Sequence, residues 1–98
     1  FIATDDGSVT DKLKSVLVAE GFNVYWNTAV TQTGFDESLF NTKDKKSRYI
    51  DTLNMLLDMD ILIHSSFFIG TYTSNVSRIV PLYVGFGKSL SLDDEWKL

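Results

Sequence analysis

Hydroxyl side chains directly follow a short apolar run and directly precede a helical pattern. The run is Phe67 to Gly70, and Thr71, Thr73 and Ser74 come after it. The first backbone N–H groups of a helix lack partners within it, and the helix dipole is positive at that end, so the two together attract an anion. The pattern can therefore form a diphosphate site. On local preference alone, the simpler interpretation is that Ser74 only caps its own helix.

The helix that would begin here adds two further candidates. Asn75 stands at its start, and Arg78 follows one turn on. A guanidinium suits either a phosphate or an acidic neighbour, and the ion pair is the default expectation. Asn75-Val76-Ser77 also matches a glycosylation sequon, but such motifs belong on exposed loops, so we expect no glycan at a helix start.

Three carboxylates come next as candidates. Asp5 and Asp6 follow the apolar segment 1–4, where they can accept hydrogen bonds from sugar or ribose hydroxyls, or simply begin a turn. Asp58 belongs to a polar stripe on an otherwise apolar helix and can accept N–H groups from a guanine edge. Periodicity alone favours a solvated helix face for Asp58.

A metal site is not expected. Asp58-Met59-Asp60 has the form of a metal-binding Asp-x-Asp motif, but within a helix its two carboxylates point roughly 200° apart. His64 is the only histidine and there is no cysteine, so zinc would lack its preferred ligands.

Apolar patterns predict alternating strands and helices. The predicted strands are 1–4, 22–26, 67–70 and 89–92, the third of them covered on both faces. The predicted helices are 8–21, 47–64, which should be mostly buried, and one from Asn75 onwards. Such alternation favours parallel pairing, and therefore an α/β fold with a Rossmann-like parallel sheet and flanking helices, whose ligands bind at the strands' carboxyl ends.

Several local details accompany these elements. We expect Ser8 with Asp11 to cap the first helix and Gly21 to close it. In the helix from Asn75, Pro81 predicts a kink or an early end near Val80. Its inward stripe is predicted as Val76, Ile79, Val80 and Tyr83. Residues 27–46 form a long loop or insertion, and the acidic run at 93–95 favours a last helix start.

Size and charge narrow the possible functions. The chain has 98 residues, 44% of them hydrophobic, which suits one domain over 1–98. Its net charge is −4, whereas a nucleic-acid reader shows a basic face. We therefore expect no nucleic-acid partner. No run approaches the ~18 apolar residues of a membrane span, so we expect no membrane contact.

Several motifs together resemble a known family. They are Ile2-Ala3-Thr4-Asp5-Asp6, then Leu57-Asp58, then the block from Phe67 to Arg78, and finally Ser91-Leu92-Asp93-Asp94. In this order they resemble the α-1,6-fucosyltransferases that modify N-glycan cores or bacterial chitin oligosaccharides, known as glycosyltransferase family 23. The strand-to-helix block and the Thr-Asp-Asp strand end carry the resemblance, whereas 27–46 matches poorly and Pro81 departs from the family helix.

The resemblance implies the donor-binding half of a GT-B-type enzyme that transfers fucose from GDP-fucose to a GlcNAc hydroxyl, with inversion and without a metal or other cofactor. It implies that Asp5 and Asp6 are required for activity, that Asp58 reads guanine and that Ser74 binds phosphate. The catalytic base, the basic phosphate clamp and most of the glycan acceptor site would precede Phe1. We accordingly expect a fragment, inactive alone, from the Golgi lumen if the parent is eukaryotic or the cytoplasm if it is bacterial.

Two alternatives stay open. A protein O-fucosyltransferase-like donor domain shares the architecture and a serine-rich strand-to-helix turn. A non-catalytic α/β binding or signalling module would use Asp5 and Asp6 as an acidic pocket. Such a module normally has a central strand ending in a phosphorylatable Asp, whereas the run 67–70 leads into a hydroxyl.

Overall fold

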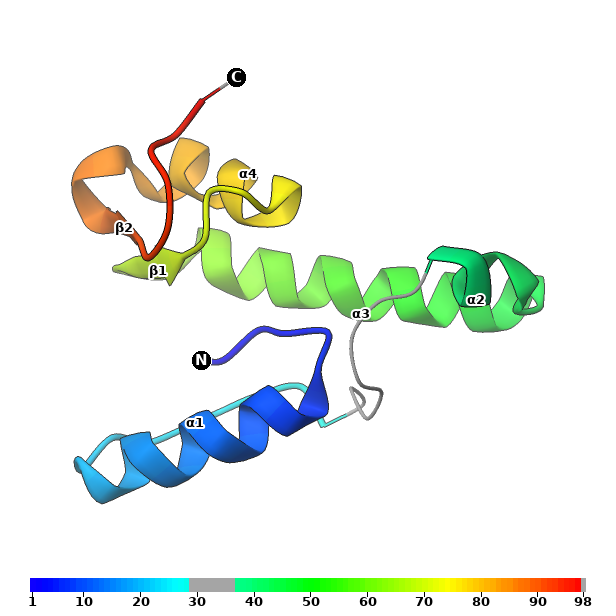
Figure 1. The fold of residues 1–98 in the computed structure, drawn as a ribbon, viewed down its shortest axis with the longest axis horizontal. Helices are drawn as coiled ribbons and strands as arrows, with labels where there is room; N and C mark the ends of the chain where they lie inside the picture. The colour runs from blue at the N-terminus through cyan, green and yellow to red at the C-terminus, as the bar shows by residue number, and fades with distance from the viewer. Residues whose placement is uncertain (29–36, 98) are drawn as a thin grey trace. The chain divides into compact units, whose positions relative to one another are not determined.

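The computed structural model describes residues 1–28 and 37–97, which divide into two compact units. The first is Phe1–Asp58 and the second Met59–Leu98. Figure 1 shows the elements along the chain, and each unit is described by itself. The helices are α1 (Gly7–Ala19), α2 (Glu37–Thr42), α3 (Lys45–Ile63) and α4 (Asn75–Val84), with a short 3₁₀ helix η1 (Phe86–Lys88), and the strands are β1 (Phe68–Gly70) and β2 (Ser89–Ser91).

Helix α1 begins two residues earlier than a Ser8 cap would place it, at Gly7. Asp6 is the N-cap, in extended backbone conformation, and its carboxylate accepts from the Ser8 N–H at 2.9 Å and the Ser8 hydroxyl at 2.7 Å. The predicted cap by Ser8 with Asp11 is therefore wrong. A carboxylate one position before the first turn reaches the free N–H groups better than a hydroxyl already inside it.

The end of α1 is as predicted. Gly21 has a φ of +91°, a backbone conformation that side chains disfavour. Its N–H donates to the Val18 carbonyl and the Phe22 N–H to the Leu17 carbonyl, at 3.0 Å each. This pair of bonds is the Schellman motif, so the prediction that Gly21 closes the helix is confirmed.

An isolated bridge joins the segments on either side of α1 in the described part of the chain. Ile2 and Trp26 form an isolated parallel bridge, with the Ile2 N–H donating to the Tyr25 carbonyl at 2.9 Å. The parallel direction predicted for 1–4 and 22–26 is present, but neither segment forms a strand.

The predicted loop 27–46 contains helical structure. α2 lies within it and α3 begins at Lys45, while 29–36 lie outside the described residues. The Asp44 carboxylate accepts from the Ser47 N–H at 2.7 Å near the start of α3. A continuous loop is therefore not present over all of 27–46, because six residues are too short for a helical period to show in the sequence. The alternative of an insertion stays a prediction.

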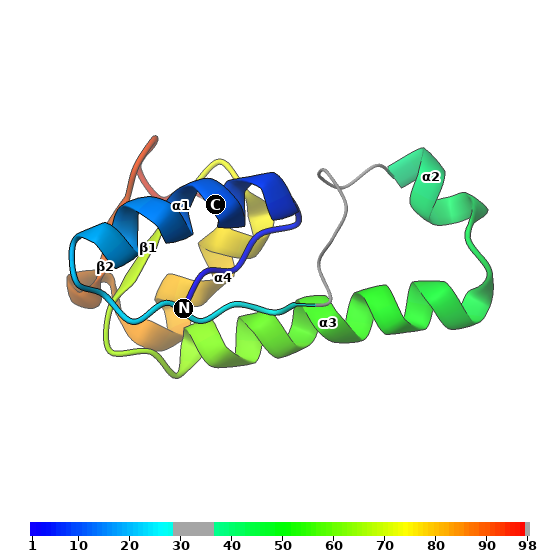
Figure 2. The ribbon, with the colours of Figure 1, turned by 90° about the horizontal axis from the view of Figure 1, so that it is seen from below.

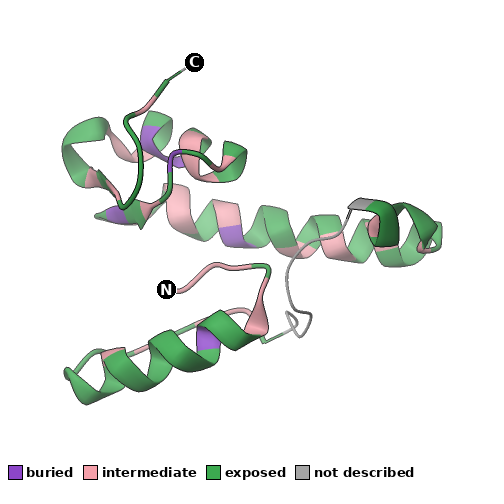
Figure 3. Cartoon of the chain, in the orientation of Figure 1, coloured by how far each residue is buried: buried purple, intermediate pink, exposed green. Residues whose placement is uncertain are grey.

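Helix α3 is confirmed, but its predicted burial is wrong. Its apolar residues Leu53, Leu56 and Leu57 are exposed, and its buried residue is Asp58, as the single purple turn of α3 in Figure 3 shows. A helical period indicates which face is apolar, whereas burial needs a layer against that face.

The second unit contains a parallel strand pair. β1 and β2 pair in parallel, with Phe68 opposite Ser89 and Gly70 opposite Ser91. α4 follows β1 in the chain and packs beside it, as Figure 2 shows. The α/β arrangement is thus present, although two strands are too few to establish a Rossmann sheet. The predicted last strand 89–92 is confirmed as β2.

The core of the second unit is small. Phe68, Tyr72 and Val80 form its cluster of buried hydrophobic residues, and Leu62, Ile63, Val84 and Trp96 pack against them. Only one face of β1 is covered, since Ile69 remains 57% exposed. The expectation of two covered faces is wrong, because a pair of strands with one helix buries one side.

Helix α4 differs from its prediction in two ways. Val80 and Pro81 are its buried residues, whereas Tyr83, predicted to face inward, is 67% exposed. The helix does not end at Pro81 but runs to Val84, where the Gly85 N–H donates to the Pro81 carbonyl at 2.9 Å. The early end predicted near Val80 is wrong.

The acidic run after β2 is not helical. Residues 93–97 have no regular structure, so the helix predicted to start there is wrong. The Asp93 carboxylate binds the turn between β1 and α4 instead. No helix in the described ranges has the length and apolar character to cross a membrane.

Candidate anion site at the turn between β1 and α4

The turn from β1 into α4 presents Ser74, whose hydroxyl does not cap the helix that it begins. The Ser74 N–H closes the turn onto the Thr71 carbonyl at 3.1 Å, and Ser74 occupies the N-cap position in extended conformation, with φ −84° and ψ 129°. Its side chain makes no capping hydrogen bond. The interpretation in which the hydroxyl serves its own helix is therefore not what the structure shows.

Arg78 lies one turn into α4 and forms no ion pair with any described residue. Its Nε is buried without a hydrogen-bond partner in that part of the chain, while its carbonyl accepts from the Trp96 indole N–H at 2.8 Å. The ion pair expected by default is absent from the described structure. A buried guanidinium N–H without a partner is uncommon in a folded protein, and a bound anion is one group that can satisfy it.

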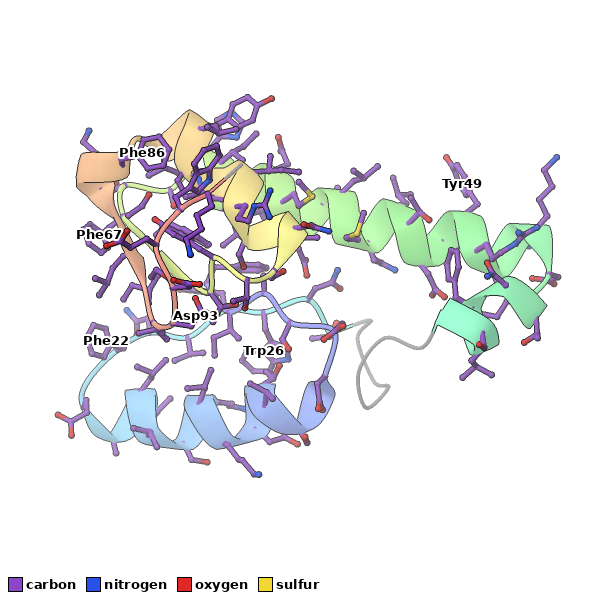
Figure 4. The ribbon with its side chains drawn as sticks, turned by 45° about the horizontal axis from the view of Figure 1, so that its top comes forward. Phe22, Trp26, Tyr49, Phe67, Phe86 and Asp93 are labelled. Carbon is purple, nitrogen blue, oxygen red and sulfur yellow. The ribbon has the colours of Figure 1, made fainter. Side chains whose placement is uncertain are left out.

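Asp93 is the carboxylate that contacts this turn, and it is labelled in Figure 4. It accepts from the Tyr72 N–H at 2.8 Å, the Thr73 hydroxyl at 2.5 Å, the Ser91 hydroxyl at 2.9 Å and the Asp94 N–H at 2.6 Å. These hydrogen bonds, that of Thr73 first, hold the pKa of the Asp93 carboxyl far below its usual range, because they favour the charged form.

Asp93 was not among the site residues expected from the sequence. It appears there only within Ser91-Leu92-Asp93-Asp94, with no role attached. Nothing in the spacing indicates that it reaches Tyr72 and Thr73, about 20 positions earlier, because that contact depends on the pairing of β1 with β2. Thr73, predicted as a phosphate donor, gives its hydroxyl hydrogen to Asp93.

Asp58 lies in the first unit, in a small polar cluster. It is 9% exposed, and the Asn27 side-chain amide donates to its Oδ1 at 3.3 Å and to Asn54 Oδ1 at 3.2 Å. Burial raises the pKa of the Asp58 carboxyl, and the Asn27 hydrogen bond opposes that shift. The solvated-face interpretation is wrong for Asp58. Asn27, its partner, was hidden within the predicted loop 27–46.

The raised pKa of Asp58 predicts that its ionised carboxylate lowers the stability of the folded chain, to an extent that depends on pH. Its folded pKa lies above the unfolded value near 3.8, so the contribution of Asp58 to stability is full below that value and is lost as pH rises through the folded pKa. Asp58→Asn should therefore be more stable than the parent chain at pH 7, with the difference shrinking towards pH 4. Thermal melts of both proteins across this range measure that difference.

The control for this prediction is Asp60→Asn, which removes an exposed carboxylate from the same helix. The difference in stability between Asp60→Asn and the parent chain should not shrink from pH 7 to pH 4 as that of Asp58→Asn does. A constant difference between Asp58→Asn and the parent chain would contradict the prediction, because it would mean that Asp58 is ionised equally easily in both states.

Asp5 and Asp6 have different surroundings. Asp5 is exposed. Asp6 caps α1, and hydrogen bonds from Ser8, its hydroxyl first, lower the pKa of the Asp6 carboxyl. Its N–H donates to the Thr4 hydroxyl at 3.1 Å. The Asp6 carboxylate thus caps helix α1, rather than ending a strand as the sequence suggested.

The candidate residues that follow β1 lie together in the structure, whereas the three candidate aspartates belong to the other unit. Thr71, Thr73, Ser74, Asn75 and Arg78 lie together in one turn and the helix start of the second unit, and Asp5, Asp6 and Asp58 belong to the first unit. No group of three or more His, Cys, Asp or Glu side chains placed to hold a metal occurs in the ranges 1–28 and 37–97. Comparison with protein-family models, curated proteins and solved structures finds no match.

Proposed function

We propose that this chain is the donor-binding portion of an inverting, metal-independent fucosyltransferase that transfers fucose from GDP-fucose to a GlcNAc hydroxyl of a glycan in α-1,6 linkage. The observation that carries the proposal is the Ser74 hydroxyl at the N-terminus of α4, which follows a parallel strand and makes no capping bond to its own helix. A hydroxyl at that position which does not cap the helix is available to a phosphate oxygen.

The donor's diphosphate would bind at the start of α4. The Ser74 hydroxyl and the first backbone N–H groups of the helix, beginning at Asn75, supply neutral donors, and the helix dipole favours the negative charge. Arg78 supports the same assignment, since its Nε is buried and unpartnered among the described residues. A guanidinium is the side chain best suited to share a phosphate's charge.

The remaining assignments come from the family resemblance. Asp58 would read the guanine base, and its partial desolvation supports this because a buried carboxylate accepts strong hydrogen bonds from N–H donors. Asp5 and Asp6 would be the acidic pair needed for transfer. The catalytic base of such an enzyme has no candidate in this chain, so we expect donor binding without turnover.

Calorimetric titration with GDP, GMP and ADP in EDTA tests the proposal. We expect the chain to prefer GDP over both competitors without metal. Ser74→Ala should weaken GDP binding about tenfold, the loss of a hydrogen bond to a charged group. Asp58→Ala should remove the preference for GDP over ADP, because a guanine edge offers a carboxylate two N–H donors that adenine does not.

Matched controls separate the site from general effects. Ser66→Ala removes an exposed serine before β1, and Asp60→Ala removes an exposed carboxylate from α3. Both should bind GDP as the parent chain does. Folded protein that binds none of the three nucleotides would overturn the proposal. Equal binding of GDP and ADP would favour the non-catalytic binding module instead.

A further inference from the structure

The turn between β1 and α4 has two separate sets of hydrogen-bond donors. The Tyr72 N–H and the Thr73 hydroxyl point to Asp93, at 2.8 and 2.5 Å. The Ser74 hydroxyl makes no capping bond, and it lies with the first N–H groups of α4 beyond that contact. Asp93 therefore accepts hydrogen bonds from Tyr72 and Thr73, next to the proposed phosphate site. The Ser74 hydroxyl and the first N–H groups of α4 are not its donors.

The segment that carries Asp93 fastens the turn at both of its ends. Before the turn, the Leu92 N–H donates to the Gly70 carbonyl at 2.8 Å. After it, the Trp96 indole N–H donates to the Arg78 carbonyl at 2.8 Å, and Trp96 packs edge-on against Phe86 at 5.5 Å between ring centroids. Asp93 lies between these two attachments, so residues 92–96 hold the turn along its length.

The oxygens of Asp93 are already occupied by protein donors. Both accept hydrogen bonds from the turn, and Oδ1 also accepts from Ser91 and Asp94. The carboxylate therefore already serves the turn and its own segment, and its charge would repel a phosphate if it were moved closer. Any effect of Asp93 on the binding of an anion must therefore act through the turn at Tyr72 and Thr73, which Asp93 holds by hydrogen bonds.

We propose that Asp93 is a positioning residue for the proposed donor site, which holds Tyr72 and Thr73 so that Ser74 and the start of α4 are presented to the diphosphate. This inference rests on the proposed function. Without Asp93, Tyr72 and Thr73 lose their charged acceptor and the turn gains freedom, so that ligand binding must order it again. Asp93 contacts no ligand itself.

The test uses the 98-residue chain with GDP as the probe. Asp93→Asn should bind GDP about tenfold more weakly than the parent chain, because one charged acceptor of several hydrogen bonds is lost. Asp94→Asn is the matched control, since it removes the same charge from the next residue, whose carboxylate serves Glu95 and Lys97 instead. It should bind within about twofold of the parent chain. Circular dichroism shows whether each variant is folded.

A double-mutant cycle with Ser74→Ala separates positioning from general destabilisation. If Asp93 acts through Ser74, then Asp93→Asn should weaken GDP binding much less in the Ser74→Ala background than in the parent chain. Hydrogen exchange of the Tyr72 amide should also accelerate in Asp93→Asn, because that N–H loses its carboxylate partner.

The outcomes of these experiments distinguish the positioning role of Asp93 from the proposed function. Parent-like GDP binding by folded Asp93→Asn, or losses that simply add in the double mutant, would overturn the positioning role and leave the proposed function standing. Absence of GDP binding by the folded parent chain would overturn the proposed function and the positioning role with it. If Asp93→Asn does not fold, Thr73→Val takes its place, since it removes one donor to Asp93 and keeps the charge.

Discussion

Replacing Phe68 by alanine is expected to lower the free energy of unfolding by about 3–5 kcal/mol, the usual result of removing a buried phenyl group. Phe68 is 5% exposed and belongs to a small core cluster, whose other buried hydrophobic residues in the described part of the chain are Tyr72 and Val80. A core of this size cannot close over the cavity by shifting many neighbours. Denaturant titration followed by circular dichroism measures the change.

The preceding residue provides the control for this prediction. Phe67→Ala removes the same side chain from a position that is 55% exposed, and it should change the free energy of unfolding far less. Equal losses from the two substitutions would contradict the structure, because they would mean that both rings are buried to the same extent.

Gly70→Ala is expected to destabilise the second unit by about 1–3 kcal/mol, the range for overpacking a well-filled core. A Cβ atom at Gly70 would overlap with Cζ of the Phe68 ring, closer than non-bonded atoms can approach. The ring is buried and has little room to turn away. Gly70 therefore cannot gain a side chain without moving either Phe68 or the end of β1, and a lowered midpoint in denaturant would report this.

Gly87→Ala is the matched control, since a Cβ at Gly87 meets no atom within 4 Å and its φ is not in the left-handed region. It should leave stability within about 0.5 kcal/mol of the parent chain. An unchanged midpoint for Gly70→Ala would show that the Phe68 ring does not lie over the end of β1. The proposed phosphate site would be affected as well, because Gly70 ends the strand that leads into it.

Local sequence signals located most of the elements. Apolar periodicity indicated α1, α3 and α4, and the short apolar run before Thr71 indicated β1. Gly21 closes α1 for a reason visible in the sequence, since only glycine adopts its backbone conformation without strain. Such signals depend on neighbouring residues, so they need no knowledge of the rest of the chain.

Burial was predicted poorly. A helical period identified the apolar face of α3, yet Leu53 and Leu57 on that helix are exposed. Asp58, which periodicity alone placed in solvent, is the buried residue. Whether a face is covered depends on which other segment reaches it, and a pattern within one helix carries no information about that.

For the candidate site, too, the sequence predicted the local features and the tertiary structure decided the contacts between distant residues. The sequence by itself determined that a strand passes through hydroxyl residues into a helix at Ser74, because strand, turn and helix start are consecutive. Only the tertiary structure decided that the Ser74 hydroxyl does not cap its helix and that Asp93 accepts hydrogen bonds from Tyr72 and Thr73. The physical reason is that Asp93 reaches the turn through the parallel pairing of β1 with β2, a contact between residues far apart in the chain.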